Sequence, residues 1–399
     1  MNTSKTLRTT LLCALIVWTL ATPKAAVAEP DSAASPATAP EKAQLPHHDL
    51  QSRGVVYDVG LHFTPETLSI EKYNPELVEF DMRAIAGELH ANTVRIEGEE
   101  IQRLVDASTA AHRAGLKVFF NPWKMGADGE ETVSYMAEAA AAAERLRLQG
   151  VDIVFVAGCE YTIFCKGALP GDAFNDRLSA LMKAIQTSME TKAVSRELES
   201  ASARLNEILA RAVAGIRQRF KGPVTYASGP WESIDWSIFD IVGVDHYRNG
   251  ETEETYIAGL ERYRLGKPLF VMEVGSCTYE GAGARGAGGF MILQGTNPDG
   301  TPKYAGGTPP TRSEREQADY VETQVRVLNK AGVDGVFIYV FAFPLYPYDE
   351  KGIDLDMTSF AIVRSFPKHD PRSNQIPSWE KKESYRRLAA VYGELARKL

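Results

Sequence analysis

The chain has 399 residues, a formal net charge of −8 and a hydrophobic content of 44%. These values lie close to those of globular proteins, so the composition excludes a wholly disordered chain. The acidic balance argues against a nucleic-acid-binding protein, which usually carries a basic patch. The length is sufficient for a large core without disulfide bonds.

The first 28 residues have the pattern of a secretory signal peptide. A short basic start precedes an apolar run at 11–21, and Ala26-Val27-Ala28 provides small residues for cleavage. The apolar run is too short to span a membrane, and no later stretch reaches about 18 apolar residues. We therefore expect a protein that is secreted or periplasmic and has no membrane anchor.

The rest of the chain divides into a linker and one folded domain. Residues 29–52 are rich in Ala and Pro and predict a flexible linker. From 53 to 399, short β-branched runs alternate with long amphipathic runs. Strands are predicted at Val55–Leu61, Thr93–Glu97, Lys117–Asn121, Asp152–Ala157, Val224–Ser228, Ile241–His246, Leu269–Val274 and Gly335–Phe341. Helices are predicted at Pro75–His90, Glu100–Ala114, Glu130–Gln149, Ala173–Phe220 with a break near Thr191, Thr252–Leu265, Ser313–Ala331 and Trp379–Lys398.

This alternation predicts an α/β fold of the (β/α)8 TIM-barrel class. Glycines at positions 115, 150, 222, 266 and 332 each close a predicted helix just before the next strand. Eight strands separated by helices favour a closed parallel barrel over an open sheet. In such a barrel the chemistry takes place at the C-terminal ends of the strands, which is where candidate site residues are sought.

Two carboxylates occupy such positions. The fourth predicted strand is followed by Glu160, and the seventh contains Glu273 near its end. A buried strand seldom ends in an acid without a reason, because an unpaired charge there is costly. Two facing carboxylates can divide acid and nucleophile roles between them. The alternative for each acid is a structural ion pair with Arg95 or another base at the barrel mouth.

Further polar and aromatic groups lie at the other strand ends. Arg95 lies inside the second strand, and Trp123 and Trp231 offer flat rings on which sugars can stack. The complete set of predicted substrate-binding residues is Arg95, Asn121, Trp123, Trp231, His246, Tyr247 and Tyr339.

With these residues the chain resembles the clan A retaining glycoside hydrolases, which include the family-five cellulases and mannanases. The resemblance implies that Glu160 is the acid/base and Glu273 the nucleophile. It also implies that Arg95 and Tyr247 hold Glu273 ionised. It predicts a secreted retaining glycosidase that cleaves an oligo- or polysaccharide and needs no cofactor or metal.

The chain departs from that family at two positions. Clan members usually have Asn directly before the acid/base, where this chain has Cys159. Their usual Trp platform on strand eight is absent, so Tyr339 or Phe341 must replace it. Cys159 motivates one alternative, a carbohydrate-binding pseudoenzyme on the same barrel. A metal-dependent barrel hydrolase is the other, with His62 and His246 as ligands, although the histidines are scattered along the chain.

Three cysteines remain after the predicted cleavage. Cys165 follows Glu160 by five residues and Cys277 follows Glu273 by four, so the two loops meet if the glutamates face each other. We therefore predict a Cys165–Cys277 disulfide and a free, buried Cys159.

Overall fold

The computed structural model describes residues 49–298, 301–350 and 352–398. The predicted signal peptide lies outside these residues, and so does most of the predicted linker. The last linker residue, Ser52, already begins the first strand. In the described part of the chain, no helix has the length and apolar character needed to cross a membrane.

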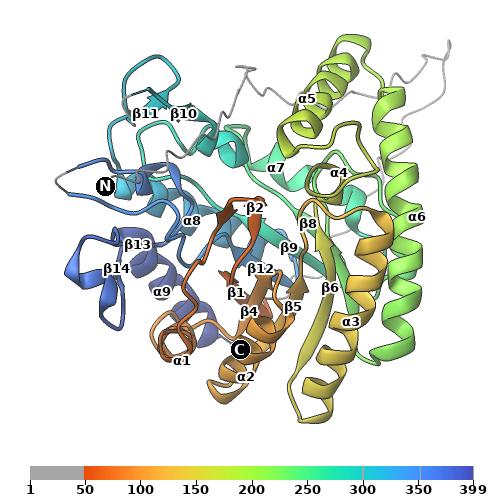
Figure 1. Ribbon diagram of the computed structural model, residues 1–399, viewed down its shortest axis with the longest axis horizontal. Helices are drawn as coiled ribbons and strands as arrows, with labels where there is room; N and C mark the ends of the chain where they lie inside the picture. Colours follow the sequence, from red (N-terminus) through yellow and green to blue (C-terminus); the bar gives the residue numbers. More distant parts are fainter. Residues whose placement is uncertain (1–48, 299–300, 351, 399) are drawn as a thin grey trace, which may run out of the picture.

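Eight parallel strands form the predicted barrel (Figure 1). They are β1 (Ser52–Asp58), β4 (Thr93–Gly98), β5 (Lys117–Pro122), β6 (Ile153–Cys159), β7 (Val224–Ala227), β8 (Val242–Asp245), β9 (Leu269–Val274) and β12 (Gly335–Ile338). Their order is β7-β6-β5-β4-β1-β12-β9-β8. A parallel bridge between Ser228 and Val244 links the two outer strands, so the barrel is nearly closed. The TIM-barrel prediction is confirmed.

Helices connect most of the barrel strands. They are α1 (Pro75–Gly87), α2 (Ile101–Arg113), α3 (Gly129–Leu148), α4 (Tyr161–Phe164), α5 (Phe174–Thr191), α6 (Arg196–Arg219), α7 (Glu253–Ala258), α8 (Glu314–Lys330) and α9 (Glu383–Ala396). Short 3-10 helices occur at η1 (Trp236–Ile238), η2 (Glu261–Tyr263), η3 (Gly286–Ile292), η4 (Asp356–Thr358) and η5 (Pro371–Asn374). Helix α3 packs against α6, and α8 packs against α9.

One helix prediction is confirmed in detail, and another is wrong at its start. The predicted break near Thr191 is present, because α5 ends at Thr191 and Ser195 caps the start of α6. The last predicted helix, by contrast, begins with a strand, β14 (Trp379–Lys381), which pairs with β13 (Val363–Ser365). Trp379 is buried there and its indole N–H donates to Asp81 at 2.8 Å, a contact between distant parts of the chain that local periodicity does not reveal.

Aromatic side chains fill part of the barrel interior. Phe119 of β5 lies 5.1 Å from Phe270 of β9 and 4.8 Å from Phe337 of β12, measured between ring centroids. All three side chains are buried. This apolar packing supports the polar strand ends.

Three insertions surround the mouth of the barrel. The hairpin of β2 (His62–Thr64) and β3 (Thr67–Leu68) follows β1, helices α4 and α5 follow β6, and the hairpin of β10 (Leu293–Thr296) and β11 (Pro302–Tyr304) follows β9. Figure 1 shows α4 and α5 at the end of β6, close to the upper part of α6. Residues of β2, α5 and β10 line the same cavity.

The predicted Cys165–Cys277 disulfide is wrong. Cys159, Cys165 and Cys277 are all free and buried. The Cys165 thiol donates to the carbonyl of Lys124 at 3.7 Å, whereas that of Cys277 donates to the carbonyl of Thr358 at 3.3 Å. The two loops follow β6 and β9, which are not neighbours in the sheet, and their thiols turn into different parts of the core.

Because these thiols are free, a reducing agent is expected to leave the stability of the folded domain unchanged. A disulfide typically contributes about 2–4 kcal/mol, so its loss would be visible in a melting curve. The measurement is the Tm of the purified domain with and without dithiothreitol. A lower Tm in the reductant would contradict the free-thiol assignment.

Candidate active site

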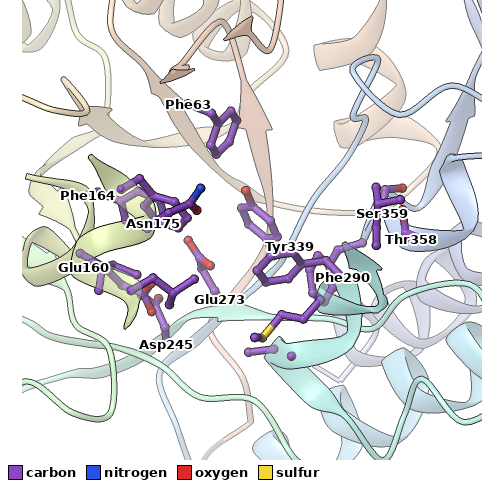
Figure 2. A pocket seen from close by; sticks show the side chains of 18 of the residues that line it. Phe63, Glu160, Phe164, Asn175, Asp245, Glu273, Phe290, Tyr339, Thr358 and Ser359 are labelled. Carbon is purple, nitrogen blue, oxygen red and sulfur yellow. The ribbon is translucent and has the colours of Figure 1, made fainter. Parts of the chain in front are cut away.

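A cavity of about 2180 Å³ opens at the C-terminal ends of the strands. Glu160, Asp245 and Glu273 line it together with aromatic rings, among them Phe63, Phe164, Phe290 and Tyr339. Figure 2 shows Glu160, Asp245 and Glu273 close together, with Phe63, Phe164, Phe290 and Tyr339 around them. The structure therefore brings the two predicted glutamates into one cavity.

The end of β6 departs from regular strand geometry at the residues next to Glu160. Its pairing with β7 shifts register between Val156 and Cys159. Gly158 has φ 101°, and a Cβ atom at this position would meet the ring of Tyr161 at 2.1 Å. Glu160 follows in the left-handed region at φ 42° and leads into the single turn of α4. This irregular backbone directs Glu160 into the cavity instead of along the strand.

Glu273 is held on both carboxylate oxygens. The Arg95 guanidinium donates from Nη1 to Oε1 at 2.9 Å, and the Tyr247 hydroxyl donates to Oε2 at 3.1 Å. Such contacts fix the direction in which the carboxylate points. The geometry predicted for Arg95 and Tyr247 around Glu273 is thus present.

Arg95 and Asn121 lie beneath the cavity and do not line it. Both are completely buried. Arg95 Nε donates to Asn121 Oδ1 at 2.8 Å, and Arg95 Nη2 lies 3.2 Å from Glu97 Oε2. Burial raises the pKa of the Glu97 carboxyl well above its ordinary value. The structure thus places Arg95 and Asn121 behind Glu273, where they position the carboxylate, rather than in contact with a substrate as predicted.

Glu160 has a different environment from Glu273. Burial raises the pKa of the Glu160 carboxyl well above its ordinary value, and the negative charges of Asp245 and Glu273 raise it further. A carboxyl group in such a setting retains its proton towards neutral pH. Glu273 thus has a cation directly behind it, whereas Glu160 is kept in its protonated form. A nucleophile and a general acid need this difference in environment.

The thiol of Cys159 lies between the carboxyl groups of Glu273 and Asp245. It donates to Glu273 Oε1 at 3.4 Å and to Asp245 Oδ2 at 3.5 Å. Burial and the charges of Asp245 and Glu273 raise the pKa of this thiol well above its ordinary value, so it is neutral. A neutral thiol is a weak hydrogen-bond donor, and here it faces both carboxylates.

The predicted aromatic residues take different positions. Trp123 is buried and packs edge-to-face on Phe164 at 4.7 Å, so it offers little open ring surface to a ligand. Trp231 lines the cavity and its indole N–H donates to Thr162 Oγ1 at 2.8 Å. Tyr339 also lines the cavity, whereas Phe341 is buried in the core. Tyr339 is therefore the ring that faces the cavity from the eighth barrel strand.

His62 and His246, the two histidines considered as metal ligands, contact different neighbours. His246 Nε2 lies 3.0 Å from the carbonyl of Tyr256, and burial lowers the pKa of this imidazole to about 4. His62 Nδ1 lies 2.7 Å from Glu99 Oε2. Both residues line the cavity, but each is bonded to a separate neighbour. Among the described residues, the grouping with metal-ligand spacing is instead Cys159, Asp245 and Glu273, whose ligand atoms lie within 4.8 Å of one another.

Sequence reasoning missed Glu232, which fixes the loop carrying Glu160. Its Oε1 accepts from the backbone N–H and the hydroxyl of Thr162 at 3.1 and 2.7 Å, and its Oε2 accepts from the N–H of Gly229 at 3.1 Å. The Tyr226 hydroxyl donates to the same carboxylate. The only sequence signal is an acid close to Trp231 after the fifth strand, and nothing there indicates that Thr162 is its partner.

Replacing Glu232 by Gln is expected to lower stability more at pH 5 than at pH 8. Burial raises the pKa of Glu232 from 4.5 to about 7. The folded state therefore binds this proton more tightly, and the stability it contributes is present below about pH 4.5 and lost as the pH rises through about 7. The Gln variant lacks this contribution, so the difference between the two pH values is expected to be about 1–3 kcal/mol.

Urea unfolding at both pH values measures this difference. Glu280→Gln is the matched control, because Glu280 is exposed. An equal loss of stability at pH 5 and pH 8 in Glu232→Gln would show that Glu232 does not titrate in this range.

The barrel resembles solved structures of glycoside hydrolases. A GH113 β-1,4-mannanase has 15% sequence identity and a TM-score of 0.52, and the match covers 86% of this chain and 99% of the mannanase. The GH113 β-mannanase AaManA from Alicyclobacillus acidocaldarius has 16% identity and a TM-score of 0.50, covering 87% and 98%. A Bacteroides uniformis β-glucuronidase has 13% identity and a TM-score of 0.51, covering 87% of this chain and 35% of the glucuronidase.

At these identities the comparison shows a shared barrel fold. No protein-family model matches the sequence, and no curated protein matches it. The similar structures are described as GH113 mannanases and other glycosidases, so the expected likeness to family-five enzymes in particular is not supported.

Proposed function

We propose that this protein is a retaining glycoside hydrolase in which Glu273 is the nucleophile and Glu160 the acid/base. The observation that carries the proposal is the contrast between the two carboxylates in one cavity. Glu273 has a guanidinium directly behind it, whereas Glu160 is surrounded by apolar groups and negative charges that raise its pKa. The match to glycosidase barrels is consistent with this assignment.

In the proposed reaction, Glu273 attacks the anomeric carbon while Glu160 donates its proton to the departing glycosidic oxygen. A covalent glycosyl-enzyme results, and Glu160 then removes a proton from the water that hydrolyses it. Arg95 and Tyr247 keep the Glu273 carboxylate directed into the cavity throughout. The space of about 2180 Å³ exceeds the usual ~300–1,000 Å³ of small-ligand pockets, which favours an oligo- or polysaccharide.

We also propose that the protein acts outside the cytoplasm. The basic start, short apolar run and small-residue cleavage site at 1–28 support export. This part of the proposal is independent of the chemistry and is tested by N-terminal sequencing of the mature protein.

The experiment is a screen of the purified domain against plant and cell-wall polysaccharides, read by reducing-end release. On an active substrate, proton NMR of the first product then reports whether the anomeric configuration is retained. Release of the retained anomer in the presence of a chelator supports the proposal. Inversion would remove the nucleophile role from Glu273, and loss of activity with the chelator would favour the metal-dependent alternative.

A carbohydrate-binding protein without turnover is the second candidate, and Cys159 is the observation that favours it. The thiol contacts the carboxylates of Glu273 and Asp245 and offers them only weak hydrogen bonding. Calorimetry on the same glycans separates the two functions. Binding without release of reducing ends, on a glycan that the protein recognises, would favour the binding protein.

A further inference from the structure

Asp245 is a buried acid that the proposed reaction does not use. It lies at the end of β8, lines the cavity and is 2% exposed. Its Oδ2 accepts from the Cys159 thiol, whereas Oδ1 has no hydrogen-bond partner among the described residues. A buried carboxylate oxygen without a partner is costly, and this one belongs to a side chain that lines a ligand cavity. Figure 2 shows Asp245 close to Glu160.

With Glu160 protonated, the carboxyl groups of Asp245 and Glu273 share a single cation, Arg95. Burial and the charge of Glu273 raise the pKa of Asp245 well above its ordinary value, so Asp245 ionises more readily when a cation binds beside it. Glu160, Asp245 and Glu273 all line the bottom of the cavity, and Arg95, the cation behind them, is already bonded to Glu273 and paired with Glu97. The other cationic side chains that line the cavity are Lys166, Arg177, Arg262 and Lys303. Arg177 and Arg262 donate to backbone carbonyls in the walls. A ligand that brings one positive charge to the bottom of the cavity would favour the ionised form of Asp245.

A single N–H donor fits the vacant oxygen better than a metal ion does. The possible metal ligands Cys159, Asp245 and Glu273 include Glu273 Oε1, to which Arg95 Nη1 already donates at 2.9 Å. A divalent cation on that oxygen would lie against the guanidinium. Oδ1 of Asp245, in contrast, is free to accept one strong hydrogen bond from an ammonium group.

We propose that the sugar bound next to Glu273 carries a free amine, and that its ammonium group binds Oδ1 of Asp245. This inference rests on the proposed glycosidase function and narrows its substrate class to glycans containing an unacetylated amino sugar. The cations in the walls disfavour a long polycation, so one charged sugar in this position is expected rather than a fully charged chain. Asp245 is then a specificity residue.

The test measures binding, so its result does not depend on catalysis. Glucosamine, galactosamine and mannosamine are each compared with the N-acetylated sugar and the parent hexose by ligand-observed NMR titration of the purified domain. At least one free amino sugar is expected to bind about tenfold tighter than both of its neutral counterparts. Asp245→Asn is expected to abolish this preference, and Asp106→Asn, an exposed acid on α2, is expected to retain it.

Each outcome decides for or against the inference. Equal binding of amino and neutral sugars by the wild-type protein overturns it, even if glycans are hydrolysed. Preference that persists in Asp245→Asn also overturns it, and so does stoichiometric binding of zinc or calcium ions alone that depends on Asp245. Asp245→Ser provides a second variant if Asn disturbs folding. Equal binding of amino and neutral sugars by the wild-type protein overturns the inference without any variant. Failure of the proposed function appears separately, as absence of turnover on every glycan.

Discussion

Glu273→Gln is expected to reduce kcat/KM by a factor on the order of 10⁴ or more while the domain stays folded. The substitution removes the attacking carboxylate but keeps the shape and one oxygen that Arg95 and Tyr247 can contact. The measurements are initial rates on the best glycan from the screen and the Tm of the variant. Glu280→Gln, at an exposed position, serves as the matched control and should retain full activity.

Glu160→Gln distinguishes the two roles. A substrate with a good leaving group, such as a dinitrophenyl glycoside, needs no proton from the enzyme in the first step. This variant should therefore release about one equivalent of phenol in a burst and then turn over slowly, because water lacks its base. Wild-type turnover in either variant would show that the assignment of the pair is wrong.

Arg95→Met is expected to lower both stability and activity. Arg95 is completely buried and bonds Glu273, Asn121 and the carbonyl of Met272, and it also pairs with Glu97. Removing one partner of a buried ion pair typically costs about 3–5 kcal/mol. Misdirection of the nucleophile should reduce kcat about 10²-fold. Urea unfolding and initial rates measure the two effects.

The double variant Arg95→Met/Glu97→Gln separates the two roles of Arg95. Neither oxygen of Glu97 has a hydrogen-bond partner in the described part of the protein, so neutralising Glu97 should recover part of the lost stability. Activity should remain low, because Glu273 still lacks its cation. Recovery of both stability and activity would mean that Arg95 has only a structural role.

The barrel could be predicted because its pattern is local. Each strand is a short β-branched run, and the glycines before the strands mark helix ends; Gly150, for example, has φ 95° at the end of α3. The position of Glu273 followed from the same pattern, because the end of an apolar strand is visible in the sequence. Asp245 met this criterion as well, but its vacant oxygen depends on which neighbours surround it.

Side-chain contacts that depend on how distant loops pack against each other could not be predicted from the sequence. Cys165 and Cys277 follow strand ends by similar distances, but one thiol packs beside Lys124 and the other beside Thr358. Trp123 has the sequence position of an exposed platform, but Phe164, the last residue of α4, packs edge-to-face against it. These outcomes are set by packing between segments that are far apart in the chain.

Helix α5, which lines one wall of the cavity, shares a small core with α6. Leu181 and Ala184 of α5 and Leu198 and Ala201 of α6 are buried together in a cluster separate from that of the barrel, and Phe164 contacts both clusters. The wall and the carboxylates of Glu160 and Glu273 thus depend on different sets of packing contacts. Over evolutionary time, substitutions between α5 and α6 can change the shape of the cavity wall without altering the packing around these two glutamates.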